Sequence, residues 1–113
     1  MSFFGRIFWE PVVTVGALEL QEKLKHGKRP FLLDVREPEE FRLGHIAGAK
    51  LIPLGELTRR MQEVPKGCEI VCICASGHRS IPAVRKLSAA GCTASSVKNG
   101  IIAWRRAKLP TSK

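Results

Sequence analysis

The stretch Glu69-Ile-Val-Cys-Ile-Cys74, followed by Ala75-Ser-Gly-His-Arg79, decides the fold of this sequence. Its first six residues form a nearly continuous apolar run, which is typical of a strand buried on both faces in a parallel sheet. Residues 80–90 then place alanine, valine and leucine on one side of a helix, and Gly91 follows as a stop signal. The stretch therefore predicts a central parallel strand, a tight loop and a helix.

Strands and helices alternate along the rest of the chain. Apolar, β-prone runs predict further strands at residues 12–15, 31–35, 50–52 and 93–97. Helical spacing and helix-start residues predict helices at 17–24, from Pro38, at 54–62 and at 101–106. This order predicts the α/β class, a three-layer α/β/α arrangement with a mainly parallel central sheet. The tail, residues 108–113, is expected to fray.

Length and composition limit the class of protein. The chain has 113 residues, which fits one domain, and its 44% hydrophobic and 26% charged residues exclude disorder, collagen-like repeats and coiled coil. No apolar run approaches the roughly 18 to 20 residues that cross a bilayer. The first ten residues are too short and too broken for a signal peptide. We therefore expect a cytoplasmic protein.

The charge is distributed unevenly. The net charge is +9, yet the last acidic residue is Glu69, and residues 70–113 hold eight lysines and arginines. Such a field attracts anions, whether a small oxyanion, an acidic protein or a nucleic acid, unless it is only a solvated basic face. Nucleic acid is not an expected partner, because the cations are not interleaved with aromatic residues.

The four cysteines do not have the spacing of a disulfide or metal motif. Cys72 and Cys74 lie two apart in the predicted strand, on the same side and about 6.6 Å from each other, which is poor disulfide geometry. A zinc site with Cys68 and His78 would need ligands converging from a strand and a turn. We expect free thiols, no metal and no cofactor, with Cys72 packed in the core. Cys68 and Cys92, near loop edges, are open to sulfur relay or to bonding another chain.

The loop after the central strand has the composition of an anion cradle. Ligands of open α/β sheets bind beyond the carboxyl ends of the strands, and this strand ends at Cys74. Residues 75–77 are small, and Gly77 can take a positive φ, so successive N–H groups can converge above the Cys74 sulfur. The positive end of the following helix also favours thiolate over thiol. Arg79 supplies a permanent cation suited to an oxyanion.

These residues stand within a longer series of motifs. The series is Leu33-Asp-Val-Arg-Glu37, Glu39-Glu-Phe41, Gly44-His-Ile-Ala-Gly-Ala49, Ile52-Pro53, Cys74-x-x-Gly-x-Arg-Ser80, and Gly100 ahead of Trp104. In this order the sequence resembles a single-domain rhodanese, a thiosulfate sulfurtransferase. Asn99-Gly100 departs from the paired glycine of that family. The resemblance divides the chain into an N-terminal apolar extension (1–13), a rhodanese-like domain (14–107) and a C-terminal tail (108–113).

The resemblance implies a double displacement. The Cys74 thiolate attacks the outer sulfur of thiosulfate, sulfite leaves, and the Cys74 persulfide waits for cyanide, a thiol or a protein thiol. The loop residues that the resemblance assigns to binding are Ala75, Ser76, Gly77, His78 and Arg79. The residues that it places behind the loop are Asp34, Arg36 and Ser80. Asp34 either tethers the loop through Arg79 or pairs with another charge.

Two other functions stay open. One is a sulfur carrier or binding module that a partner protein loads, with the basic C-terminal half as a docking region. The other is a phosphatase or arsenate reductase, whose related folds place five residues between Cys and Arg, whereas four stand between Cys74 and Arg79. The shorter loop favours a single sulfur atom. His78 either tunes the thiolate or faces solvent.

The N-terminus carries an apolar cluster, which is Phe3, Phe4, Ile7, Phe8 and Trp9. Folding back over the sheet is the first expectation for it. A dimer contact is the second, so the protein is expected to be a monomer or a homodimer. Docking on a membrane surface with the help of Arg6 is the least favoured.

Overall fold

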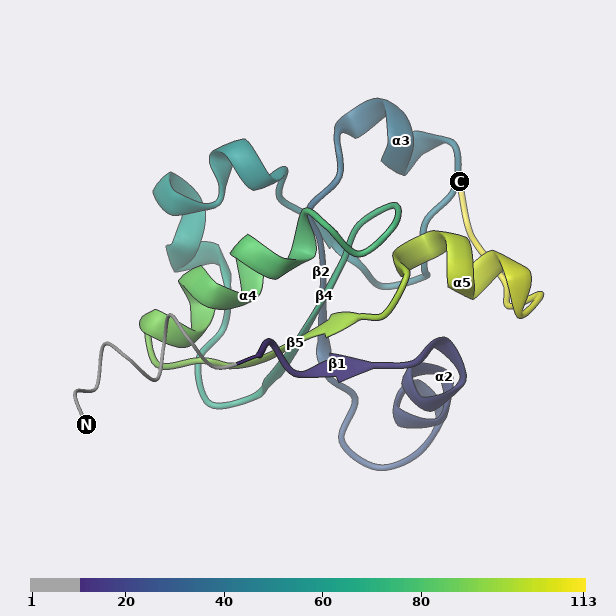
Figure 1. Ribbon diagram of the computed structural model, residues 1–113, viewed down its shortest axis with the longest axis horizontal. Coiled ribbons are helices and arrows are strands. Elements are labelled where there is room, and N and C mark those ends of the chain that lie inside the picture. The colour runs from purple at the N-terminus through teal and green to yellow at the C-terminus, as the bar shows by residue number, and fades with distance from the viewer. Residues whose placement is uncertain (1–10) are drawn as a thin grey trace.

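A parallel five-stranded sheet organises the molecule (Figure 1), and the computed structural model describes residues 11–113. The strands are β1 (Thr14–Val15), β2 (Phe31–Asp34), β3 (Lys50–Leu51), β4 (Glu69–Ile73) and β5 (Thr93–Val97). Their order is β1-β5-β4-β2-β3, and each of the four ladders is parallel. The predicted α/β class with a mainly parallel sheet is confirmed.

Strand β4 lies at the centre, as its apolar sequence predicts. It pairs with β2, where Cys72 is opposite Leu33, and with β5, where Cys72 is opposite Ser96. Residues 70–73 are fully buried. Because β4 has a strand on each side and helices above and below, both of its faces need apolar side chains.

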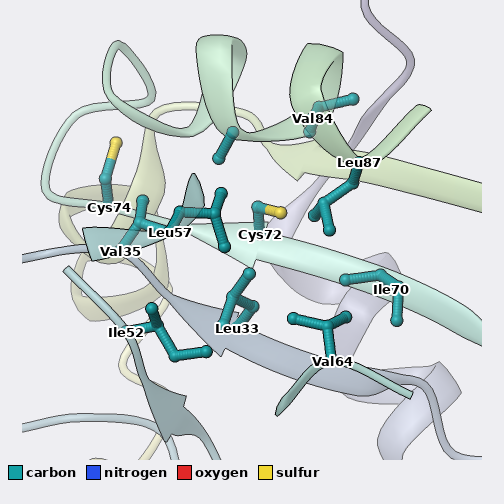
Figure 2. Close-up of a cluster of buried hydrophobic side chains, with 11 residues drawn as sticks. Leu33, Val35, Ile52, Leu57, Val64, Ile70, Cys72, Cys74, Val84 and Leu87 are labelled. Carbon is teal, nitrogen blue, oxygen red and sulfur yellow. The ribbon is translucent and has the colours of Figure 1, made fainter. Parts of the chain in front are cut away.

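Helices cover both faces of the sheet. The α-helices are α2 (Ala17–Lys25), α3 (Pro38–Arg42), α4 (Ser80–Ala89) and α5 (Gly100–Arg106). On one face α2 and α5 pack against the sheet through Leu20 and Trp104. On the other face α4 packs through Val84 and Leu87 against Leu33 and Cys72 (Figure 2). The three-layer arrangement is therefore confirmed.

The segment predicted as one helix at 54–62 is two shorter turns. It forms the 3-10 helices η1 (Leu54–Glu56) and η2 (Thr58–Glu63), which meet at the fully buried Leu57. Gly55 lowers the helix propensity, and Arg60 leaves the helical region at φ −117° and ψ 17°. The expectation of a regular helix is wrong because 3-10 geometry suits such short pieces.

The C-terminal tail is fastened to the domain, so the expectation that it frays is wrong. The Trp104 indole N–H donates to the Pro110 carbonyl at 2.8 Å. The backbones of His45 and Ser112 exchange two hydrogen bonds, of 2.9 and 2.7 Å. His45 is far from the tail in sequence, which is why the sequence pattern missed this contact.

The sequence predicts membrane contact only as one option for the N-terminal apolar cluster. Within residues 11–113, none of the helices has the length and apolar character to cross a membrane. The apolar cluster of the first nine residues lies outside the described residues. The expectations that it folds back, forms a dimer or meets a membrane therefore stay predictions.

Candidate active-site loop around Cys74

Cys74 is the residue that follows β4, at the carboxyl edge of the sheet. Its side chain lies at the end of the buried hydrophobic cluster and points towards the loop, as Figure 2 shows, and the residue is only 1% exposed. The Gly77 N–H donates to the Cys74 Sγ at 3.1 Å, and the Ser80 N–H donates to it at 3.4 Å. The loop therefore directs backbone donors from two positions at one sulfur atom.

Gly77 makes the curl of this loop possible. Its φ is +99°, which confirms the predicted positive φ. A Cβ atom added at this position would lie 3.1 Å from the backbone nitrogen of Asn99. A side chain is therefore disfavoured here both by the backbone conformation and by the space available.

The first turn of α5 supports the loop from below. The N–H groups of Ile101 and Ile102 donate to the carbonyls of Cys74 and Ala75, at 2.8 and 3.1 Å. A Cβ on Gly100 would collide with those same carbonyl oxygens. Asn99 has a φ of +59°, and asparagine tolerates this left-handed region better than most residues. Asn99-Gly100 thus keeps the backbone that close support of the loop requires.

Ser80 connects the sulfur to the sheet. Its hydroxyl lies 3.5 Å from the Cys74 Sγ and donates to the Gly77 carbonyl at 3.3 Å. It also shares a hydrogen bond with the Ser96 hydroxyl, and both serines are buried. Sequence reasoning missed Ser96, because a serine in a strand carries no signal of which helix residue it meets.

Arg79 forms an ion pair with Glu40 of α3. Its Nη1 and Nη2 atoms donate to the two carboxylate oxygens at 2.6 and 2.8 Å. The hydrogen bond from Arg79 holds the pKa of Glu40 at about 2, and the bond from Glu40 raises the pKa of Arg79. Sequence reasoning missed Glu40, since Glu37, Glu39 and Glu40 are equal candidates until the helix is oriented.

Asp34 pairs with Arg36 rather than with Arg79. The Arg36 Nε and Nη2 atoms donate to the Asp34 carboxylate at 2.8 to 3.1 Å, and both side chains are at most 3% exposed. Arg36 also donates to the Gly44 carbonyl at 2.9 Å and the Glu40 carbonyl at 3.4 Å. Of the two roles that the sequence leaves open for Asp34, pairing with another charge is observed. Its link to the loop is indirect, through the position of α3.

Ser76 and His78 lie on the solvent side of the loop. Both are exposed, and the Ser76 hydroxyl lies 2.9 Å from the Nδ1 atom of His78. Ala75 and Arg79 are half-buried between these residues and the sheet. The structure thus brings all the predicted loop residues together, with His78 facing outward.

The other thiols are distant or inert. All four cysteines are free, and burial raises the pKa of Cys72 to about 12. Cys68 precedes β4, six residues and thus about 20 Å along an extended strand from Cys74. The pairing of Glu69 with Thr93 puts Cys92 at the same far edge. The geometry therefore does not allow direct sulfur relay to Cys68 or Cys92 within one molecule. Among residues 11–113, there is no group of three or more His, Cys, Asp or Glu side chains that could hold a metal ion.

The fold and this loop define a parallel α/β domain whose central strand presents a cysteine to backbone donors. The family model described as the rhodanese-like domain matches residues 17–107. A sulfurtransferase of Allochromatium vinosum is 36% identical over 100 residues, which are 88% of this chain and 94% of that protein. YtwF of Bacillus subtilis is 33% identical over 93 residues, 82% of this chain and 90% of YtwF.

A solved structure agrees with these relatives. The crystal structure of a rhodanese-related protein from Thermoplasma volcanium matches with a TM-score of 0.83 at 34% identity, over 88% of this chain and 97% of that chain. This protein belongs to the family of rhodanese-like domains. The resemblance that its motifs indicate is confirmed.

Proposed function

We propose that this protein is a sulfurtransferase that moves sulfane sulfur through a persulfide on Cys74. The donor is thiosulfate or an organic persulfide, and the acceptor is cyanide, a thiol or a protein thiol. The observation that carries the proposal is the position of the Cys74 Sγ, which accepts the N–H groups of Gly77 and Ser80. The same donors can stabilise an anionic sulfur both before and after loading.

The proposed reaction has two displacement steps. The Cys74 thiolate bonds to the outer sulfur of the donor, the donor's S–S bond breaks, and its electron pair leaves with sulfite or a thiolate. The acceptor then attacks the outer sulfur of the Cys74 persulfide and regenerates the thiolate. Arg79 lies at the edge of the loop, and the buried Ser80 holds the loop carbonyl of Gly77.

Loop length supports sulfur transfer over phosphate chemistry. Four residues separate Cys74 from Arg79, and the Gly77 N–H is already 3.1 Å from the sulfur. A tetrahedral phosphate or arsenate needs a ring of donors wide enough for four oxygen atoms around its centre. The observed loop closes on one sulfur atom, which favours a persulfide.

The oxidation state of the cysteines bears on the cellular compartment of the proposed reaction. All four cysteines are unpaired, and Cys68 is exposed. Free exposed thiols persist in a reducing compartment. We propose the cytoplasm as the location of this reaction, and the free thiols support this proposal.

The direct test is the intact mass of the reduced protein before and after incubation with thiosulfate, and separately with glutathione persulfide. We expect a gain of one sulfur atom with at least one donor, and its loss on addition of cyanide. Peptide mapping is expected to place the extra sulfur on the peptide that contains Cys74. Failure of both donors to add sulfur would contradict the proposal.

The Gly77→Ala substitution tests the loop. The variant is expected to load sulfur about tenfold more slowly, because an added Cβ displaces the loop amide by crowding the Asn99 backbone. Gly91→Ala is the matched control, since Gly91 has a φ of +92° and open space around it. Both variants should lose about 1–2 kcal/mol of stability from a side chain at positive φ. Equal loading rates in the two variants would argue against the role of the loop.

A second candidate, a sulfur carrier that docks on a partner protein, is supported by the outer face of α5. Three exposed residues share that face, namely Ile102, Arg105 and Arg106. The backbone N–H of Ile102 donates to the Ala75 carbonyl of the loop, so this face is connected to the site. Steady turnover with a small donor and cyanide separates the two functions. A carrier would show one loading event from a protein persulfide and little turnover with small donors.

A further inference from the structure

The charge of Arg79 is already neutralised in the folded protein. Both terminal nitrogens of its guanidinium donate to the Glu40 carboxylate, at 2.6 and 2.8 Å. Glu40 is itself held in place, because its Oε1 atom accepts the Glu37 N–H at 2.9 Å in the capping box of α3. With a pKa of about 2, the Glu40 carboxylate stays ionised at every pH at which the enzyme would be assayed.

The other arginine of this corner is neutralised as well. Arg36 is bound to the buried Asp34 carboxylate, to the Glu40 carbonyl of α3 and to the Gly44 carbonyl that follows this helix. The exposed His78 ring engages Ser76. The entrance to the loop thus combines backbone N–H donors directed at one sulfur with arginines whose charge is matched by carboxylates.

Donors of sulfane sulfur differ in the chemical group that remains at the entrance to the loop when their outer sulfur reaches Cys74. Thiosulfate is a dianion, and when its outer sulfur reaches Cys74 its sulfonate oxygens remain at the edge of the loop. A guanidinium holds such oxygens best through a two-bond pair and an unmatched positive charge, and Glu40 already takes the pair at the tip of Arg79 and balances its charge. An organic persulfide has no sulfonate, and its leaving group is a thiolate on a carbon chain.

We propose that Glu40 determines donor specificity by occupying Arg79, so that the site prefers an organic persulfide to thiosulfate. The inference deepens the proposed sulfurtransferase function and rests on it. In the loading step the Cys74 thiolate bonds to the outer sulfur of R–S–SH, the S–S bond breaks, and R–S⁻ leaves with the electron pair. The proton stays on the transferred sulfur, so atoms and charge balance without an oxidant or reductant.

The test compares the wild type with Glu40→Gln, using thiosulfate and glutathione persulfide as donors. Glutamine keeps the size of the side chain but no longer cancels the charge of Arg79. The matched control is Glu39→Gln, since Glu39 is an exposed carboxylate in the same helical turn, whereas the carboxylate that Arg79 bonds is that of Glu40. Single-turnover loading rates at several donor concentrations separate the donor's apparent Kd from the loading rate constant.

We expect Glu40→Gln to lower the apparent Kd for thiosulfate about tenfold, while loading from glutathione persulfide changes less than about twofold. Glu39→Gln should behave like the wild type with both donors. Inhibition by inorganic sulfate gives a second measurement that needs no reaction, and it should strengthen about tenfold in Glu40→Gln only.

Three results would overturn the inference. They are an unchanged Kd for thiosulfate in Glu40→Gln, an equal slowing with both donors, or a wild type that prefers thiosulfate. An equal slowing would mean that Glu40 only supports the loop. If the wild type loads from neither donor, the sulfurtransferase function itself is contradicted. Failure of the specificity inference and failure of the proposed function are therefore distinguishable.

Discussion

Replacing Cys74 with serine is expected to abolish sulfur loading, with a fall of at least about a thousandfold in rate. A hydroxyl at this position would still meet the N–H groups of Gly77 and Ser80, but an alcohol cannot form a persulfide under these conditions. The stability of the variant should change by only about 1 kcal/mol, because the replaced atom already lies among hydrogen-bond donors. Single-turnover loading measured by intact mass checks the prediction.

Cys72→Ser is the control for Cys74→Ser. Cys72 lies two residues earlier on the same face of the chain and is also fully buried, yet it faces Leu33 and Leu87 in the core. Burial raises the pKa of Cys72 to about 12, so its thiol is not expected to react near neutral pH. This variant should lose stability but keep full loading per folded molecule. If Cys74→Ser still takes up sulfur, and this uptake disappears only when Cys72 is also replaced, then Cys72 is the nucleophile. That result would contradict the assignment to Cys74.

The fold could be predicted from the sequence where the hydrophobic pattern reflects local burial. The apolar run before Cys74 predicts the central strand because a strand covered on both faces needs apolar side chains throughout. The pattern fails where long-range contacts decide the structure. Residues 54–62 carry a helical pattern but wrap around the buried Leu57 as two 3-10 turns, and the tail is held by His45, far away in sequence.

The candidate site also has a part that the sequence predicts and a part that it does not. The loop from Cys74 to Arg79 is continuous in sequence, and its small residues and positive φ at Gly77 were predictable from residue types. Glu40 and Ser96 reach the loop from other elements, so their roles depend on the orientation of α3 and the register of β5. Sequence alone offers Glu37, Glu39 and Glu40 as partners for Arg79 and no means of choosing among them.

Replacing Asp34 with alanine is expected to cause the largest loss of stability, about 3–5 kcal/mol of an unfolding free energy of about 5–15 kcal/mol. The change leaves the Arg36 guanidinium, 3% exposed, without its carboxylate, and it also removes the acceptor of the Arg36 backbone N–H. Urea unfolding followed by circular dichroism measures the effect. Glu22→Ala is the control, because the Glu22 to His26 pair is exposed and its loss should be barely measurable.

A double variant separates the unpaired charge from simple loss of contacts. If the cost of Asp34→Ala comes from a buried cation without a partner, then Asp34→Ala with Arg36→Met should recover at least about half of it, since methionine keeps much of the packing without the charge. Loading should be slow in the double variant, because methionine cannot donate to the Glu40 and Gly44 carbonyls, which Arg36 holds and which place α3 beside the loop. Stability that recovers without loading would show that this buried pair serves the site by positioning α3. A double variant as unstable as Asp34→Ala would instead assign the cost to lost packing at the end of β2.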